Sequence, residues 1–129
     1  MTAESLTDLA TRFLSNLGEP DASMVTEDFR WWMSFRPTTM NLVEFREHVI
    51  HIALPPVEQE IIGVGEAPDR VTVEVQGRCL LPDGRRYDNN YCFIVIFRDR
   101  KICEVREYCD TKLAADLFGG LGVPATTAA

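Results

Sequence analysis

The chain has 129 residues, of which 46% are hydrophobic and 26% are charged, and its formal net charge at pH 7 is -7. This length allows one domain with one pocket and is too short for separate cofactor and substrate domains. The composition is that of a globular protein and excludes the disordered and fibrous classes. The negative charge repels phosphate backbones and anionic lipid surfaces, so we expect neither a nucleic acid nor a membrane as partner.

The first residues of the sequence do not have the pattern of a targeting signal. Residues 1–8 lack a basic region followed by an apolar one, and no stretch approaches the roughly 18 apolar residues that span a bilayer. We therefore expect a cytoplasmic protein. The cysteines are scattered, form no C-x-x-C pair and have mostly apolar neighbours, which favours reduced core residues over a zinc site or a disulfide framework: Cys79, Cys92, Cys103 and Cys109.

Two amphipathic helices and an aromatic strand are predicted in the first half of the chain. Apolar residues at helical spacing, followed by Gly18 and Pro20, indicate a helix over residues 4–17. After an acidic connector over residues 20–28, the aromatic segment 29–35 is too short for a typical helix and predicts a strand before Pro37. Asn41 and Glu44 have the spacing of a capping box, which predicts a second helix that ends at the prolines after residue 54.

The second half of the chain has the alternation of strands. Four strands are predicted, over residues 60–65, 70–81, 87–98 and 102–109, with tight connections at 82–84 and 99–101. These connections predict an antiparallel meander. A short last helix over residues 113–118 can be capped by Asp110 and Thr111. We expect residues 1–118 to form a single domain and residues 119–129 to form a flexible tail.

The strand over residues 91–97 is apolar on both faces. Alternate residues of Tyr-Cys-Phe-Ile-Val-Ile-Phe point to opposite sides of a sheet, and both sets are apolar. Helices can cover only one face of a single sheet. A second copy of the chain is the simplest cover for the other face, so we expect a homodimer joined sheet to sheet.

The stretch from Asp83 to Thr111 resembles the pattern G-x-x-Y-x-N-x-Y-x-F, followed by D-G-K-I-x-x-x-x-E-Y-x-D, of SnoaL-like proteins. Arg100 stands where that pattern has the turn glycine. The order of helices and strands is also similar to that of the nuclear transport factor 2-like superfamily, which includes polyketide cyclases, ketosteroid isomerases and limonene epoxide hydrolases. The resemblance implies an α+β fold, in which a cone-shaped, curved mixed sheet wraps around the N-terminal helices and encloses one pocket.

The resemblance also implies a catalytic position. In the polyketide cyclases an acid on the last strand moves protons, and in the epoxide hydrolases an aspartate there activates water; both correspond to Glu107. The epoxide hydrolases also have Arg-x-Asp on the middle long strand, where this chain has residues 74–78, Glu-Val-Gln-Gly-Arg. The isomerases have their base near Met33 and a carbonyl-polarising tyrosine near Phe13, and this chain matches neither.

Two interpretations of Glu107 follow from the alternation of its strand. The first places its carboxyl group among apolar side chains, where desolvation favours the protonated form and brings the pKa towards the working pH of a general acid/base; the residues on its side are Cys103, Val105 and Cys109. The second is a carboxylate at the rim of the sheet, paired with Arg78 or Arg98.

The length of the turn after residue 98 decides which residues accompany Glu107. With a three-residue loop, Asn89 and Tyr91 share its face and can hold a substrate oxygen. With a two-residue loop the register changes and Asn90 takes that place. Cross-strand packing is the alternative role of Tyr91.

Other aromatic and titratable residues are candidates for the pocket wall. Trp31 and Trp32 point to opposite faces of their strand, so one of them at most lines a pocket, and core packing is the alternative for either. His48 can reach the pocket mouth, and His51 projects away from it. We expect no metal site, because no second ligand lies at a useful spacing.

The sequence thus predicts a cofactor-independent enzyme that uses acid/base chemistry on a small apolar molecule carrying oxygen. Glu107 is the predicted catalyst, with substrate contacts from Asn89, Tyr91, Trp31 and His48. Cyclisation, isomerisation, dehydration and hydrolysis, including epoxide opening, remain open as reactions. The alternative is a non-catalytic ligand-binding or dimerisation module, in which Glu107 is structural.

Overall fold

Three α-helices, a 3-10 helix and six strands make up the part of the chain that the computed structural model describes, residues 3–52 and 54–120. In chain order they are α1 (Leu6–Leu14), η1 (Ala22–Met24), β1 (Val25–Met33), β2 (Arg36–Met40), α2 (Leu42–Ile52), β3 (Glu58–Ala67), β4 (Arg70–Arg78), β5 (Asn89–Arg98), β6 (Lys101–Cys109) and α3 (Thr111–Gly120).

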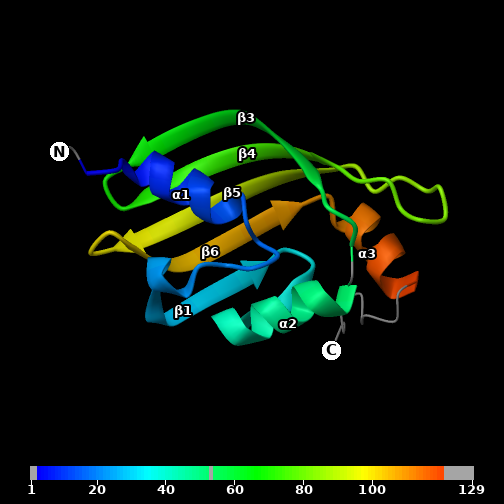
Figure 1. Ribbon diagram of the computed structural model, residues 1–129, viewed down its shortest axis with the longest axis horizontal. Helices are drawn as coiled ribbons and strands as arrows, with labels where there is room; N and C mark the ends of the chain where they lie inside the picture. Colours follow the sequence, from blue (N-terminus) through cyan, green and yellow to red (C-terminus); the bar gives the residue numbers. More distant parts are fainter. Residues whose placement is uncertain (1–2, 53, 121–129) are drawn as a thin grey trace.

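The six strands form one sheet in the order β2-β1-β6-β5-β4-β3. Strand β1 is parallel to β6, and every other neighbouring pair is antiparallel, so the sheet is mixed. The predicted meander from β3 to β6 and the predicted α+β class are therefore confirmed. Figure 1 shows the sheet curving along its length, with α1 and α2 on its concave side and α3 beyond the end of β6.

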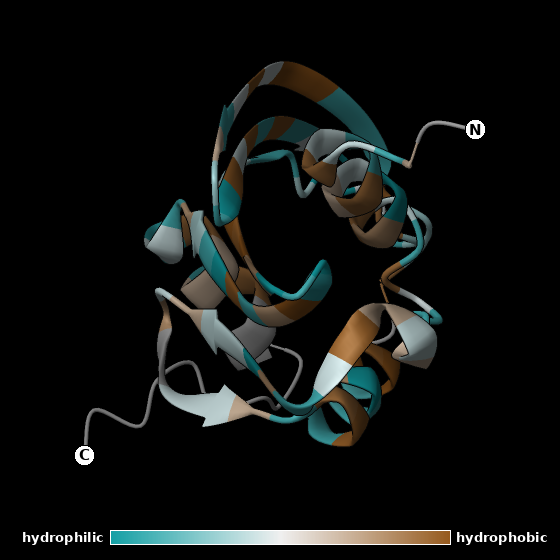
Figure 2. Cartoon of the chain, turned by 90° about the vertical axis from the view of Figure 1, so that its left-hand side faces the viewer, coloured by the Kyte–Doolittle hydropathy of each residue, from teal (hydrophilic) through white to brown (hydrophobic). Residues whose placement is uncertain are grey.

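The two N-terminal helices close the open side of the curved sheet. Helix α1 packs on β3 and β4, and α2 packs on β1 and β2. The turned view of Figure 2 shows the sheet curling around the interior, with the helices opposite it. Ala10, Phe13 and Leu14 form the buried side of α1, as the helical spacing predicts. The apolar groups of both layers thus meet inside the curve, where they leave water.

The sequence did not predict strand β2. Pro37 was expected to end the extended segment, but the chain turns at Ser34 and Phe35 and pairs back on β1, with Trp31 opposite Met40 and Trp32 opposite Thr39. A proline lacks the backbone N–H of a ladder, and β2 tolerates it because this strand lies at the edge of the sheet. Strand β1 also begins at Val25, within the segment predicted as a connector.

A two-residue turn joins β5 to β6, and a β-bulge follows it. Asp99 and Arg100 have φ angles of 50° and 63°, the left-handed conformation that short hairpin turns require. Arg98 pairs with Lys101, but from Ile96 onwards the register is displaced by one residue, and Cys103 is the extra residue. The bulge therefore places Glu107 on the same face of the sheet as Asn89 and Tyr91, as the sequence predicted for a three-residue loop.

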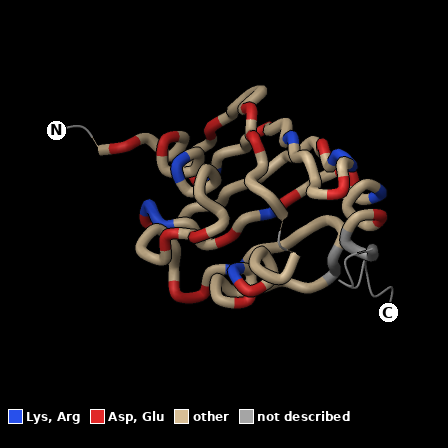
Figure 3. Tube along the Cα trace, turned by 45° about the vertical axis from the view of Figure 1, so that its right-hand side comes forward, with Lys and Arg blue, Asp and Glu red and all other residues tan. Residues whose placement is uncertain are grey.

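The described part of the chain carries mixed surface charge. In Figure 3 most basic positions lie beside acidic ones, and eight ion pairs join such neighbours. No helix in the described ranges is long and apolar enough to cross a membrane. Of the tail predicted at residues 119–129, the first two residues belong to α3, and residues 121–129 lie outside the described residues.

Helix α2 begins with the capping box that its sequence predicts. The Asn41 side-chain oxygen accepts a hydrogen bond from the Glu44 backbone N–H at 2.8 Å, and the Glu44 carboxylate accepts one from the Asn41 backbone N–H at 2.9 Å. Asn41→Ala should lower the free energy of unfolding by about 1 kcal/mol, because it leaves a helix donor without its acceptor. Chemical denaturation measures this loss, and equal stability of the two proteins would show that the cap contributes nothing.

Candidate functional site

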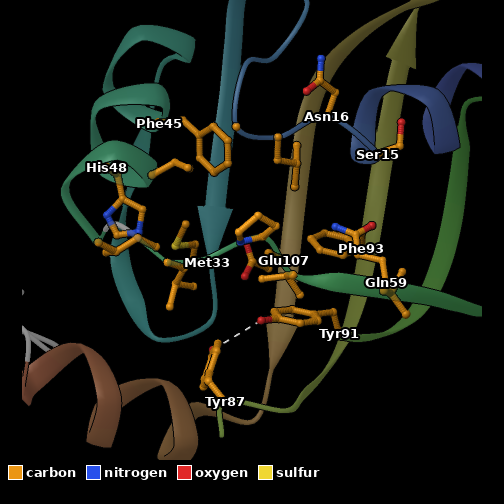
Figure 4. Close-up of a pocket in the computed structure, with 18 of the residues that line it drawn as sticks. Ser15, Asn16, Met33, Phe45, His48, Gln59, Tyr87, Tyr91, Phe93 and Glu107 are labelled. Carbon is orange, nitrogen blue, oxygen red and sulfur yellow. Dashed lines mark hydrogen bonds between the residues drawn. The ribbon is translucent and has the colours of Figure 1, made fainter. Parts of the chain in front are cut away.

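A cavity of about 470 Å³ lies between the two N-terminal helices and the concave face of the sheet. Its wall is formed by residues 15–18, which follow α1, by α2, by the segment 54–57 and by inward-facing residues of the sheet. Most of these side chains are apolar, and no lysine or arginine is among the described residues of the wall. Figure 4 shows the polar exceptions, among them Glu107, His48, Tyr87 and Tyr91. The cavity thus suits an uncharged and largely apolar ligand.

The carboxyl group of Glu107 reaches this cavity from β6. Glu107 pairs with Phe93 on β5 and with Met33 on β1, so it lies in the middle of the sheet. Figure 4 shows the carboxyl group between Met33 on one side and Tyr91 and Phe93 on the other. Only 8% of the residue is exposed. The alternation of the strand predicted Cys103 on the same side as Glu107, but Cys103 is the extra residue of the bulge.

Burial raises the pKa of Glu107 to about 7, because an apolar surrounding disfavours the carboxylate. A hydrogen bond from Trp31, whose indole Nε1 donates to Glu107 Oε1 at 3.0 Å, opposes this rise by stabilising the charged form. Near neutral pH the group is therefore present in both protonation states. A carboxyl group in this condition can both accept and return a proton.

The rim interpretation of Glu107 does not fit the structure. Arg78 pairs with Glu60 at 2.9 Å, and Arg98 pairs with Asp28 at 2.5 Å. Both pairs are solvent-exposed, and Glu107 is buried. The two arginines that were possible partners of Glu107 therefore form ion pairs with other carboxylates.

Tyr91 lines the cavity on the same face as Glu107, as expected from the longer loop. Its phenol oxygen lies 3.4 Å from that of Tyr87, which also lines the cavity and was not identified from the sequence. Burial raises the pKa of Tyr87 to about 12 and raises that of Tyr91 further, and the Glu107 charge adds to both. Both phenols are thus protonated at neutral pH and can donate hydrogen bonds.

Asn89 also shares the Glu107 face, but its side chain is not part of the cavity wall. The residue is 1% exposed, and its amide bonds to the backbone N–H and C=O of Asp110 at 3.0 and 3.2 Å and to the Tyr87 oxygen at 2.9 Å. These bonds join the start of β5 to the end of β6. Asn89 therefore holds Tyr87 in place, and its predicted contact with a substrate stays a prediction.

The remaining candidates differ in their access to the cavity. Trp31 is fully buried behind the wall, and Trp32 lies on the opposite face of the sheet near Arg106 and Tyr108. His48 lines the cavity from α2, as expected, and His51 is exposed. Gln59, Ser15 and Asn16 were not identified from the sequence, because their place in the wall depends on how α1 and β3 meet.

The described residues contain neither a cluster of metal ligands nor a disulfide bond. No group of three or more histidine, cysteine or acidic side chains there could hold a metal ion. All four cysteines are free thiols, and Cys79 alone of them is buried. The other three are half-buried, so the expected core position holds fully for Cys79 only.

Glu107→Gln should stabilise the protein at high pH. The folded-state pKa of about 7 lies above the ordinary glutamate pKa of 4.5, so the folded state binds more protons between these pH values and stability falls as pH rises through them. Above pH 7 the loss is on the order of 3 kcal/mol, and glutamine, which cannot ionise, should avoid it. Thermal unfolding from pH 4 to pH 9 measures the difference. The exposed Glu47→Gln serves as the control, and parallel pH curves for all three proteins would contradict the raised pKa.

The chain belongs to the SnoaL-like family, because the family model of the SnoaL-like domain matches residues 12–105. The expected place in the nuclear transport factor 2-like superfamily is thereby confirmed. The matched segment ends on β6, two residues before Glu107. No curated protein sequence matches the chain.

Solved structures of similar fold are numerous. PrhC from Penicillium brasilianum NBRC 6234 superposes with a TM-score of 0.74 at 22% identity, covering 91% of this chain and 87% of PrhC. A provisionally named isomerase from Rhodopseudomonas palustris has a TM-score of 0.71 at 13% identity, covering 92% and 99%. A provisionally named SnoaL-like polyketide cyclase from Jannaschia sp. CCS1 has a TM-score of 0.68 at 17% identity, covering 85% and 92%. At these identities the likeness establishes the fold alone.

Proposed function

We propose that the protein is a cofactor-independent enzyme that moves a proton within a small, uncharged, largely apolar substrate carrying oxygen. The observation that carries the proposal is the Glu107 carboxyl group, which is buried, has a pKa of about 7 and opens on a cavity of about 470 Å³. A carboxylate without a cationic partner destabilises the fold, and such groups concentrate at catalytic sites. The names of the structural relatives, an isomerase and a polyketide cyclase, agree with this class of chemistry.

In the proposed reaction the Glu107 carboxylate removes a proton from a carbon next to a carbonyl group, and the resulting carboxylic acid returns it at another atom. Proton loss leaves an electron pair that becomes negative charge on the carbonyl oxygen. The protonated phenols of Tyr91 and Tyr87 can stabilise that oxygen by donating hydrogen bonds. Their mutual contact of 3.4 Å is long, so a ligand oxygen can replace it at little cost. Isomerisation and cyclisation both fit this scheme.

The absence of cations from the described wall supports an uncharged substrate. A carboxylate or phosphate in the cavity would have no lysine or arginine to pair with, and it would be repelled by ionised Glu107. Terpenoids, steroids and aromatic polyketides without acidic groups fit this requirement. His48, on the α2 side, contributes a titratable nitrogen to the described wall.

The test begins with crystals soaked in uncharged terpenoid, steroid and aromatic polyketide ligands, followed by turnover assays on those that bind. We expect ligand density within hydrogen-bond reach of Glu107 and a rate that rises with pH up to about 7, where the base becomes ionised. Glu107→Gln should lower kcat by about 10²- to 10⁴-fold, the usual contribution of a general acid/base, with little change in ligand affinity. Glu47→Gln should leave kcat unchanged. Bound ligand with unaltered turnover in Glu107→Gln would exclude the catalytic role, and binding without any turnover would favour a ligand-binding module.

We also propose that two copies of the chain pair through the convex faces of their sheets. On that face the middle of β5 presents Cys92, Ile94 and Ile96, all half-buried. Beside them the Arg106 guanidinium lies 4.2 Å from the ring centroid of Trp32. Tryptophan, tyrosine and arginine around an apolar centre are the residues that carry most of the binding energy in protein interfaces. The ion pair of Glu104 and Arg106 offers both charges to a two-fold-related copy.

Ile94→Asp should convert the dimer to a monomer, because it places a charge in the centre of the proposed interface. Sedimentation velocity measures the change, and we expect the wild-type chain to sediment as a dimer at micromolar concentration. Val43→Asp is the matched control, since Val43 is an exposed apolar residue on α2, away from the sheet. A monomeric wild type, or a dimer that persists in Ile94→Asp, would exclude this interface.

A further inference from the structure

Trp31 and Glu107 meet where β1 and β6 run parallel, Trp31 opposite Val105 and Met33 opposite Glu107. The indole Nε1 donates to Oε1 of the carboxyl group at 3.0 Å. Trp31 is fully buried and does not line the cavity, and Glu107 does. The hydrogen bond thus comes from a side chain outside the cavity wall, and it engages one of the two carboxyl oxygens.

Two aromatic side chains of the wall fix the plane of the indole ring. Phe45 of α2 stacks on it with ring centroids 4.0 Å apart and an angle of 20°. Phe93 of β5 meets it edge to face at 6.1 Å and 70°. Since both phenylalanines also line the cavity, the ring cannot rotate away from Glu107 without disturbing that wall. The donor is therefore preorganised.

An indole N–H can donate a hydrogen bond and cannot accept one. Oε1 must then act as an acceptor whether the carboxyl group is ionised or protonated. A proton on the carboxyl group is most stable on the other oxygen, Oε2, because Oε1 keeps its partner in both states. The geometry distinguishes two oxygens that are chemically equivalent in a free carboxylate.

We propose that Trp31 is a positioning residue, which holds Oε1 of Glu107 and assigns the transferable proton to Oε2, the oxygen left for the substrate. The inference rests on the proposed function. In the forward step a substrate proton forms the Oε2–H bond, and the electron pair of the broken bond stays on the substrate. Oε1 becomes the carbonyl oxygen and remains bonded to Trp31. In the return step Oε2 gives the proton to a different substrate atom and the carboxylate is restored.

The decisive variant is Trp31→Phe, which retains an aromatic ring between Phe45 and Phe93 and removes the N–H. The carboxylate then loses the side-chain hydrogen bond that stabilises it, so the pKa of Glu107 should be higher by about one pH unit, a tenfold change in the ionisation constant. The NMR signal of the ¹³C-labelled Glu107 carboxyl carbon reports the titration directly. At pH 7 the ionised fraction, and with it kcat/KM, should fall about fivefold and recover near pH 9, a recovery that general damage to the fold would not give.

Trp32→Phe is the matched control. It makes the same change one residue along the strand, on the opposite face, where the ring contacts Arg106 and Tyr108. It should leave the Glu107 titration unchanged. The other titratable groups near the carboxyl group are His48 on α2, Tyr87, Tyr91 on β5 and Cys109 on β6. Glu107→Gln assigns the Glu107 signal among those of the other glutamates, because it removes that signal alone.

A measurement on the wild-type chain covers the case in which Trp31→Phe does not fold. The ¹H–¹⁵N signal of the Trp31 indole should shift with pH at the same midpoint as the Glu107 carboxyl carbon, and that of Trp32 should not. If the indole signal does not follow the carboxyl group, or if folded Trp31→Phe retains the wild-type midpoint, the positioning role is wrong. A wild-type midpoint near pH 4.5 would instead overturn the proposed function. The effect of Trp31→Phe on that midpoint would still test the hydrogen bond.

Discussion

The register of β6 is the constraint on which the site depends. The two-residue turn at Asp99 and Arg100 would by itself place Glu107 opposite Cys92, on the convex face of the sheet. The bulge at Cys103 adds one residue to β6 and brings Glu107 opposite Phe93, on the concave face. Because side chains alternate along a strand, this single residue decides whether the carboxyl group meets the cavity or the outside. The same bulge aligns Tyr91 with the site.

Burying Glu107 works against the stability of the fold. A carboxyl group in an apolar surrounding is stable in its neutral form, and its ionisation near neutral pH weakens the folded state. Trp31 offsets part of this cost by donating to Oε1. A structural role would be served as well by glutamine, which bears the same shape without the charge. The presence of an ionisable group at this position fits a use for its proton.

The family assignment and the chemistry of the cavity answer different questions. Membership of the SnoaL-like family establishes the curved sheet and the helices that close it. That fold supports many reactions, so the function has to be argued from the side chains that the cavity presents. Here the titratable groups are one carboxyl group, two phenols and an imidazole, in a wall that is otherwise mostly apolar and has no lysine or arginine in its described part. The arrangement favours proton transfer on an uncharged molecule.

The sequence by itself determined the local elements, and it left open whether Glu107 is buried or lies at the rim of the sheet. Helical periodicity predicted α1, the spacing of Asn41 and Glu44 predicted the cap of α2, and alternation predicted the strands of the meander. These features depend on residues close in the chain, so their signals are present in short windows. The family pattern also indicated Glu107 before any geometry was known.

The tertiary structure alone decided which of these residues share a space. It showed that Pro37 lies in an edge strand and that Tyr87 takes part in the cavity wall. It also showed that the Asn89 side chain is hydrogen-bonded to the backbone of Asp110. Through the bulge at Cys103, it also decided that Tyr91, and not Asn90, shares the face of Glu107. Trp31 reaches Glu107 across 76 positions of sequence because β1 and β6 pair in parallel. Such contacts depend on strand order and register, which are set by packing between distant segments and leave no mark in a local pattern.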